Sequence, residues 1–237
     1  QEKYSGESTA SKLQRVREEM KKVSANIHLL SSLDDIAWLL NIRGSDIAYC
    51  PLVLSYMMVY EDHAELYADE KKFPEKVLNE LKKNEIFMKP YNDIYAAVKN
   101  INPTSVILLD PERINYTLYQ NIPEEAKIIE RENPEVLMKC IKNDTEINNT
   151  KKAHLKDAVA HTKFMFWLKH ASGSDDIVTE ISASDKLESF RAQQEGYLGA
   201  SFAPISAFGE HGAIVHYSAT PESGATLHKG GILLTDT

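Results

Sequence analysis

Apolar residues recur at helical spacing near the start of the chain, and shorter apolar runs follow. The first set, Leu13, Val16, Met20 and Val23, predicts an amphipathic helix over 8–24 with Ser8 or Ser11 as its cap. Further strands are expected at 27–30, 86–89, 105–110 and 127–129. Further helices are expected at 74–83, 93–101, 116–120 and 135–141. This alternation predicts a layered α/β domain.

A hairpin interrupts the alternation. Two β-rich runs, 52–60 and 64–68, flank the polar tripeptide 61–63, and this spacing is typical of a β-hairpin. The hairpin makes the expected sheet mixed rather than purely parallel. Just before it, a helix is expected to begin at Asp34 or Asp35, to include Trp38, and to stop at Arg43-Gly44.

The polar residues 142–144 separate this pattern from a different one, so the predicted domains are 1–144 and 145–237. A long helix is expected over 146–169, followed by a turn at 173–176. The next helix begins at Thr179 or Ser182 and closes at Gly196.

The last thirty-odd residues, 201–237, carry the candidate chemistry. The apolar run 213–215 predicts a strand that ends in His216, and the run 231–234 predicts a strand that leads to Asp236. A carboxylate there can bind a metal or merely start a turn. A histidine at a strand end is more often structural than functional. His211 receives no role, since its odd separation from His216 puts the two on opposite faces of a regular strand.

Two stretches resemble one family. AFGEHGAIVHYSATPES followed by LLTDT is similar to the Xaa-Pro aminopeptidases (aminopeptidase P), creatinase/prolidase-like metallopeptidases of the pita-bread fold. Their pattern is G-x-x-x-A-x-x-H-Y, a turn, and an apolar strand leading into D-[ST]-G. SSLDDIAWLLNIRGSDIAY resembles the domain that precedes the catalytic one. The resemblance implies a creatinase N-terminal-like domain of layered mixed-sheet α/β structure, followed by the first part of an α+β pita-bread domain.

The resemblance also implies an activity. Peptides with proline at the second position would lose their N-terminal residue. Asp236 would bind one of two divalent ions, for which manganese is the expected metal, and His216 would bind the substrate or the transition state. Trp38 and Arg43 would contact substrate or an interface, and the intact enzyme would be a homodimer. The other four ligands belong downstream of Thr237, so this chain alone is expected to bind no metal and to be inactive. A prolidase, which cleaves Xaa-Pro dipeptides, and a non-catalytic pita-bread module that binds peptides or proteins remain alternatives.

Composition and charge argue against some binding partners and favour one cellular compartment. The net charge of −8 argues against nucleic acid or an anionic membrane as the main partner. No apolar run approaches the ~20 residues of a membrane span, and no stretch resembles a signal peptide. Cys50 and Cys140 lie far apart without metal-ligand spacing, which favours two reduced thiols in a cytoplasmic protein. The chain begins at Gln1 and stops just after an apolar run, so we expect it to be a piece of a longer polypeptide.

Overall fold

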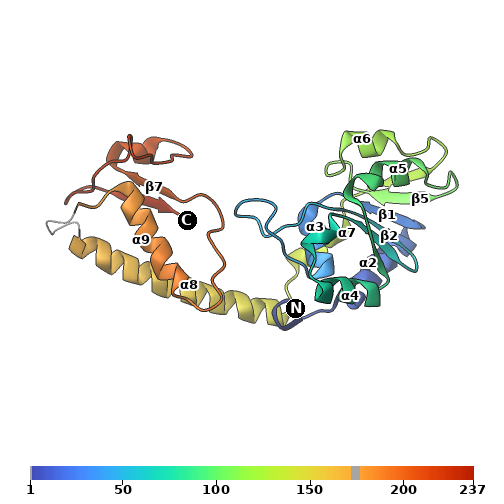
Figure 1. The fold of residues 1–237 in the computed structure, drawn as a ribbon, viewed down its shortest axis with the longest axis horizontal. Helices are drawn as coiled ribbons and strands as arrows, with labels where there is room; N and C mark the ends of the chain where they lie inside the picture. The colour runs from blue at the N-terminus through green and yellow to red at the C-terminus, as the bar shows by residue number, and fades with distance from the viewer. Residues whose placement is uncertain (1, 172–176) are drawn as a thin grey trace. The chain divides into compact units, whose positions relative to one another are not determined.

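The computed structural model describes residues 2–171 and 177–237 (Figure 1). The described chain forms two compact units, Gln1–Ile47 with Pro51–Ile147, and Ala48–Cys50 with Asn148–Thr237. We call them the N-terminal unit and the C-terminal unit. The predicted domain boundary at residue 144 stays a prediction, and the predicted turn at 173–176 lies outside the described residues.

A six-stranded mixed sheet organises the N-terminal unit. Its strand order is β4-β3-β2-β1-β5-β6. The strands are β1 (Ile27–Leu30), β2 (Tyr56–Tyr60), β3 (Ala64–Tyr67), β4 (Ile86–Lys89), β5 (Val106–Leu109) and β6 (Lys127–Glu130). β2 runs antiparallel to β1 and β3, whereas β3–β4, β1–β5 and β5–β6 are parallel pairs. The predicted hairpin and mixed sheet are therefore confirmed.

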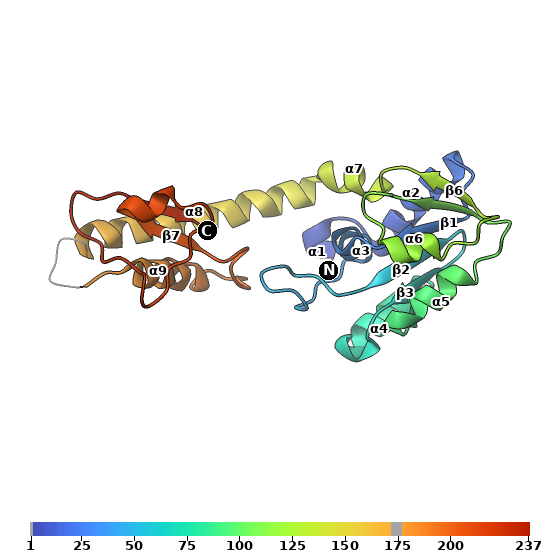
Figure 2. The ribbon, with the colours of Figure 1, turned by 90° about the horizontal axis from the view of Figure 1, so that it is seen from above.

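Helices cover both faces of this sheet (Figures 1 and 2). One buried cluster joins it to α2 (Thr9–Lys22), α3 (Leu33–Leu40), α4 (Glu75–Lys83) and α7 (Pro134–Cys140). A second cluster, on the other face, joins it to α5 (Ile94–Lys99) and α6 (Tyr116–Gln120). The short elements are α1 (Glu2–Ser5), η1 (Glu70–Lys72) and η2 (Tyr91–Asp93). Both sheet faces are buried, and the predicted layered α/β arrangement is confirmed.

Local hydrogen bonding and backbone conformation set where α2 begins and where α3 ends. Ser8 caps α2 by accepting a hydrogen bond from the Ser11 amide at 3.1 Å. The predicted end of the next helix at Arg43-Gly44 is wrong, because α3 stops at Leu40. Asn41 takes the left-handed conformation there, with φ of 54°, and asparagine tolerates that conformation better than most residues.

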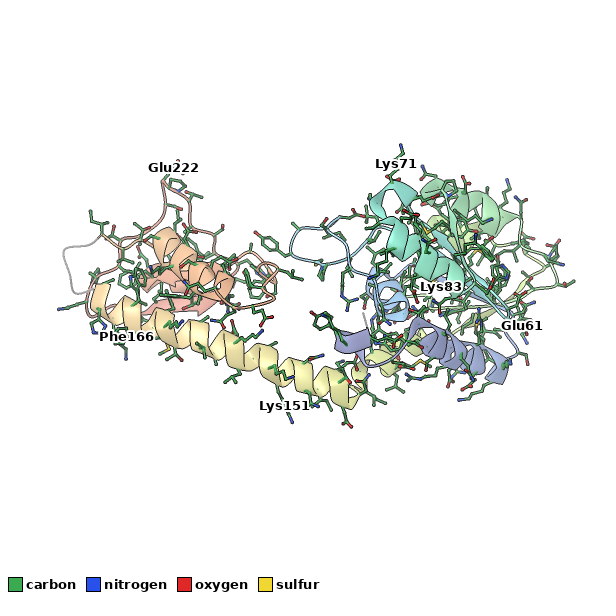
Figure 3. All side chains as sticks on the ribbon, turned by 60° about the horizontal axis from the view of Figure 1, so that its bottom comes forward. Glu61, Lys71, Lys83, Lys151, Phe166 and Glu222 are labelled. Atoms are coloured by element: carbon green, nitrogen blue, oxygen red, sulfur yellow. The ribbon has the colours of Figure 1, made fainter. Side chains whose placement is uncertain are left out.

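The C-terminal unit packs two helices against a two-stranded antiparallel sheet. Its elements are α9 (Glu180–Ala192), β7 (Ile205–Phe208), η3 (Gly209–Ala213), β8 (Leu233–Asp236) and α8 (Asp144–Ala171), whose first turn, up to Ile147, belongs to the N-terminal unit. Its core includes Phe164, Leu187, Phe208 and Leu227. On α8, Phe166 points away from this core and is 67% exposed (Figure 3). Within the described part of the chain, no helix is both long and apolar enough to cross a membrane.

Two sequence expectations fail in this unit. α9 ends at Ala192, so Gly196 does not close it. The strand expected at 213–216 is absent, and residues 205–208 form the strand instead. Gly209, with φ of 58°, turns the chain out of β7. Ile214 and Val215 are then 53% and 81% exposed, so no buried face supports a strand there.

Candidate functional site

Asp236 is the last residue of β8. Its backbone pairs with Ile205, while Leu233 pairs with Phe208 at the other end of the ladder. Exposure alternates along β8: Leu233 lies toward the core and is half-buried, whereas Leu234 and Asp236 are exposed on the opposite face. Among the described residues, the Asp236 carboxylate has no hydrogen-bond or ion-pair partner. A strand does carry Asp236, as predicted, although it spans Leu233–Asp236 and not 231–234. It presents the Asp236 carboxylate to solvent.

His216 lies in a turn rather than on a strand. It follows η3 and has φ of 55°, a left-handed conformation that is uncommon for a residue with a side chain. Its side chain is exposed, whereas the next residue, Tyr217, is only 8% exposed. The element assigned to His216 was therefore wrong, because the turn and not a strand presents its imidazole to solvent.

The segment before His216 and the strand carrying Asp236 share one face of the β7–β8 ladder. η3 lies over that face: a Cβ atom placed on Gly212 would sit 3.8 Å from the Leu234 Cβ and 4.0 Å from the Ala207 carbonyl oxygen. Within the described residues, Asp236 and His216 do not bond to each other, and no group of three His, Cys, Asp or Glu side chains could hold a metal. The roles of Asp236 and His216 remain predictions.

A buried carboxylate that the sequence did not single out lies at the start of α9. Glu180 is fully buried and accepts four hydrogen bonds. Its Oε1 accepts from the Phe208 amide at 2.6 Å and from His211 Nδ1 at 2.9 Å. Its Oε2 accepts from the Tyr217 hydroxyl and the Ala225 amide, both at 2.8 Å. Both oxygens are thus satisfied by donors from other segments.

These bonds keep Glu180 ionised. Burial alone would raise its pKa, but the amides of Phe208 and Ala225, then Tyr217 and His211, outweigh burial and hold the pKa below its ordinary value. Burial and the neighbouring Glu180 carboxylate raise the pKa of the Tyr217 hydroxyl, so that hydroxyl stays a donor. The sequence predicted only that a helix begins at Thr179 or Ser182. Thr179 caps α9 as predicted, and Ser182 completes a capping box. This capping pattern explains where the helix begins, but it gives no sign that Glu180 accepts hydrogen bonds from other segments.

His211 likewise acquires a partner that spacing could not reveal. Its ring stacks on Tyr217 at 4.6 Å between centroids, and its Nδ1 contacts Glu180. His211 and His216 do not lie on opposite faces of a strand, as the sequence predicted, since His211 belongs to the 3₁₀ turn η3. The sequence did contain a signal for this turn, because glycines at positions 209 and 212 lie on either side of His211 and glycine favours turns over strands.

Trp38 and Arg43 belong to the N-terminal unit. Trp38 is half-buried on α3 and packs against the core. Arg43 is exposed, and its Nη1 donates to the carbonyls of Ala37 at 3.1 Å and Ile42 at 2.7 Å. The Arg43 guanidinium thus satisfies carbonyls at the C-terminal end of α3. The predicted contact of Trp38 and Arg43 with substrate or an interface stays a prediction.

Lys12 lies against this block. It is 1% exposed, its Nζ donates to the Trp38 carbonyl and to Asn41 Oδ1, both at 2.8 Å, and it sits 4.3 Å from the Trp38 ring centroid. Burial lowers the pKa of Lys12 to about 8, although Glu7 and Glu146 pull it upward. The ammonium is thus held by two oxygens and an aromatic face.

The low pKa of Lys12 predicts a pH response. Because the folded-state value lies below the 10.5 of a free lysine, charged Lys12 costs stability below pH 8, and this cost is removed as the pH rises from 8 to 10.5. We expect Trp38 fluorescence, recorded in a Trp167→Phe background, to change with a midpoint near pH 8 as the charge beside the indole disappears. Lys12→Met is the control and should abolish the transition. A transition that survives Lys12→Met would contradict the assignment.

A buried ion pair links β1 to α7 in the same unit. His28 and Glu135 are both fully buried, and His28 Nε2 lies 3.1 Å from a Glu135 oxygen. His28 Nδ1 lies 3.0 Å from the Leu108 carbonyl oxygen. Burial would lower the pKa of His28, but Glu135, the Leu108 carbonyl and Asp35 outweigh it and raise the pKa. Since both ring nitrogens face acceptors, the imidazolium, which donates from both, fits this site.

Comparisons with known proteins agree with this two-part architecture. Residues 1–146 match the model of the Creatinase/Prolidase N-terminal domain, and residues 148–237 match that of metallopeptidase family M24. The chain therefore belongs to the creatinase/prolidase family of metallopeptidase relatives, joining the family's N-terminal domain to part of an M24 domain. This establishes the expected family and fold class.

Two curated relatives carry more specific names. Xaa-Pro aminopeptidase 1 of Dictyostelium discoideum is 40% identical over 99% of this chain, and aminopeptidase P2 of Arabidopsis thaliana is 32% identical over 99%. The chain spans 38% and 37% of these proteins. Among solved structures, the X-prolyl aminopeptidase of Caenorhabditis elegans superposes with a TM-score of 0.94 at 31% identity, over 100% of this chain and 39% of its own. That protein is described as a cytosolic enzyme with a di-nuclear active site.

Proposed function

We propose that this chain is part of an Xaa-Pro aminopeptidase, which hydrolyses the bond between an N-terminal residue and a following proline. One observation carries the proposal: similarity to Xaa-Pro aminopeptidases extends over almost the whole chain, in sequence and in fold. The exposure of the two motif residues supports the proposal. Asp236 ends a strand, and His216 is exposed on a turn. We propose domains 1–144 and 145–237 for this enzyme.

The proposed enzyme uses two divalent metal ions, with manganese as the proposed metal. When bound, such a pair activates a water molecule and polarises the scissile carbonyl. Asp236 fits one ion, because its carboxylate is exposed, lies on a rigid strand end and has no competing partner among the described residues. The proposal assigns the remaining ligands to sequence that follows this chain in the complete enzyme.

His216 and the N-terminal unit supply the remaining proposed contacts. The His216 imidazole donates a hydrogen bond to the substrate carbonyl oxygen as negative charge develops there, an interaction that favours the transition state over the ground state. Trp38 and Arg43 contact the substrate or a subunit interface. We propose a cytosolic homodimer that acts on peptides and not on nucleic acid or membranes; the net charge of −8 fits this choice.

The direct test measures hydrolysis by the complete polypeptide that contains this chain, purified with added Mn²⁺. A tripeptide with proline second should release its N-terminal residue, whereas the same tripeptide with alanine second should not. The 237-residue chain alone should be inactive on both, since one proposed ligand cannot hold and activate the water.

The alternatives give different results. Cleavage of an Xaa-Pro dipeptide in preference to the tripeptide would identify a prolidase. Tight binding of the tripeptide without hydrolysis at any metal concentration would identify a peptide-binding module. Hydrolysis by the 237-residue chain alone would contradict the assignment of the missing ligands.

A further inference from the structure

The turn that carries His216 has little packing of its own. Residues 213–216 are exposed, and His216 has the left-handed φ of 55°. A non-glycine residue keeps such a conformation only when its surroundings impose it. Something outside the turn must therefore hold it.

The Glu180 carboxylate holds this segment at both ends. It accepts from the Phe208 amide just before the segment, from His211 within it, and from the Tyr217 hydroxyl immediately after His216. The Tyr217 hydroxyl also lies 3.5 Å from the Ser223 carbonyl oxygen. A single rigid group thus fixes the points from which the exposed turn leaves and to which it returns.

Glu180 is itself fixed by its own element. It is the first residue of α9, behind the Thr179 cap, and its amide donates to the Ala225 carbonyl at 3.1 Å. Thr179 also forms an isolated bridge with Thr226. A carboxylate in the first turn of a helix is further stabilised by the helix dipole. With no exposed surface, Glu180 cannot touch a substrate.

We propose that Glu180 is a positioning residue that fixes the turn of residues 209–217 and thereby aims the His216 imidazole. This inference rests on the proposed function for its catalytic consequence, but the anchoring itself is independent of that function. His211 and Tyr217 transmit the constraint, since each touches Glu180 and they stack on one another.

The catalytic test uses Glu180→Gln in the complete polypeptide. The substitution keeps the volume, but it replaces one acceptor oxygen by an amide group that donates, so two of the four bonds are lost. We expect kcat to fall about 10- to 100-fold with KM unchanged, since a small misplacement of a reacting group costs up to about 100-fold. Glu188→Gln is the matched control: Glu188 is also on α9 and accepts from the Tyr197 hydroxyl. It should stay within about twofold of the parent.

A double mutant separates positioning from general damage. If Glu180 acts through His216, adding Glu180→Gln to His216→Ala lowers kcat no further than His216→Ala alone. If Glu180→Gln and His216→Ala lower kcat multiplicatively in the double mutant, the proposal is wrong. It is also wrong if Glu180→Gln and Glu188→Gln lower kcat equally.

Amide hydrogen exchange of the 237-residue chain tests the anchoring without any enzyme assay. Glu180→Gln should speed exchange at least about tenfold at the amides of Phe208 and Ala225, which donate to Glu180, and at the amide of Ile214, which donates to the His211 carbonyl. Glu188→Gln should leave exchange at these three amides unchanged. Should the complete polypeptide lack peptidase activity altogether, the proposed function fails while this exchange result still decides the role of Glu180. Unchanged exchange would refute that role whatever the activity.

Discussion

Replacing Asp236 with asparagine in the complete polypeptide should lower Xaa-Pro hydrolysis by about a thousandfold or more. An amide is a poorer ligand for a hard divalent ion than a carboxylate, and losing an ion would remove several kcal/mol of transition-state stabilisation, where about 4 kcal/mol corresponds to about a thousandfold. The measurements are kcat/KM for the proline tripeptide and the metal content of the purified protein, which should fall together.

Asp185→Asn is the matched control for this change. Asp185 is an exposed carboxylate of the same unit, on α9, so its loss changes the net charge equally and should alter kcat/KM by less than about twofold. Full activity and full metal content in Asp236→Asn would show that Asp236 is not a metal ligand.

Replacing Glu135 with glutamine should destabilise the N-terminal unit by about 3–5 kcal/mol at pH 5.5, because it leaves a buried imidazolium without its counter-charge. The cost should shrink as the pH rises. The folded-state pKa of His28 is raised, so the stabilisation by the pair is complete below the unfolded pKa near 6.5 and is lost as the pH passes the folded value. Urea unfolding at pH 5.5 and 9, followed by Trp38 fluorescence in the Trp167→Phe background, measures the loss in free energy of unfolding and its dependence on pH.

Glu132→Gln provides the comparison, since Glu132 is three residues away and exposed. It should change the free energy of unfolding by less than about 0.5 kcal/mol at either pH. Asp35 also faces His28 and pairs with Lys139, so some pH dependence will persist in Glu135→Gln. If Glu135→Gln lowers the free energy of unfolding equally at both pH values, His28 is not charged in the folded protein.

The N-terminal unit was largely predictable because burial there follows simple periodicity. The run at 27–30 became β1 at the expected residues, since all four positions are buried. The hairpin around residues 61–63 and the helix capped by Ser8 also formed as expected. The end of α3 did not, since Asn41 and Gly44 are both plausible stops, and the bond from Lys12 to Asn41, 29 positions away, is invisible to local patterning.

The candidate site was less predictable. The apolar run at 213–215 has strand composition, yet Gly209 redirects the chain and leaves the run exposed. Glu180 was missed for a different reason: its four donors come from residues 208 to 225, and only the folded chain brings them to one carboxylate. Motif resemblance found His216 and Asp236, but it contains no information on what supports them.

The two cysteines offer a practical route to studying motion. Cys50 and Cys140 are both free and exposed; Cys50 falls in the C-terminal unit and Cys140 in the N-terminal unit. Accessible thiols react with maleimide dyes without any engineered handle. The 237-residue sequence therefore already carries one attachment point on each unit, and a donor–acceptor dye pair can follow the separation between the units as temperature or denaturant concentration changes.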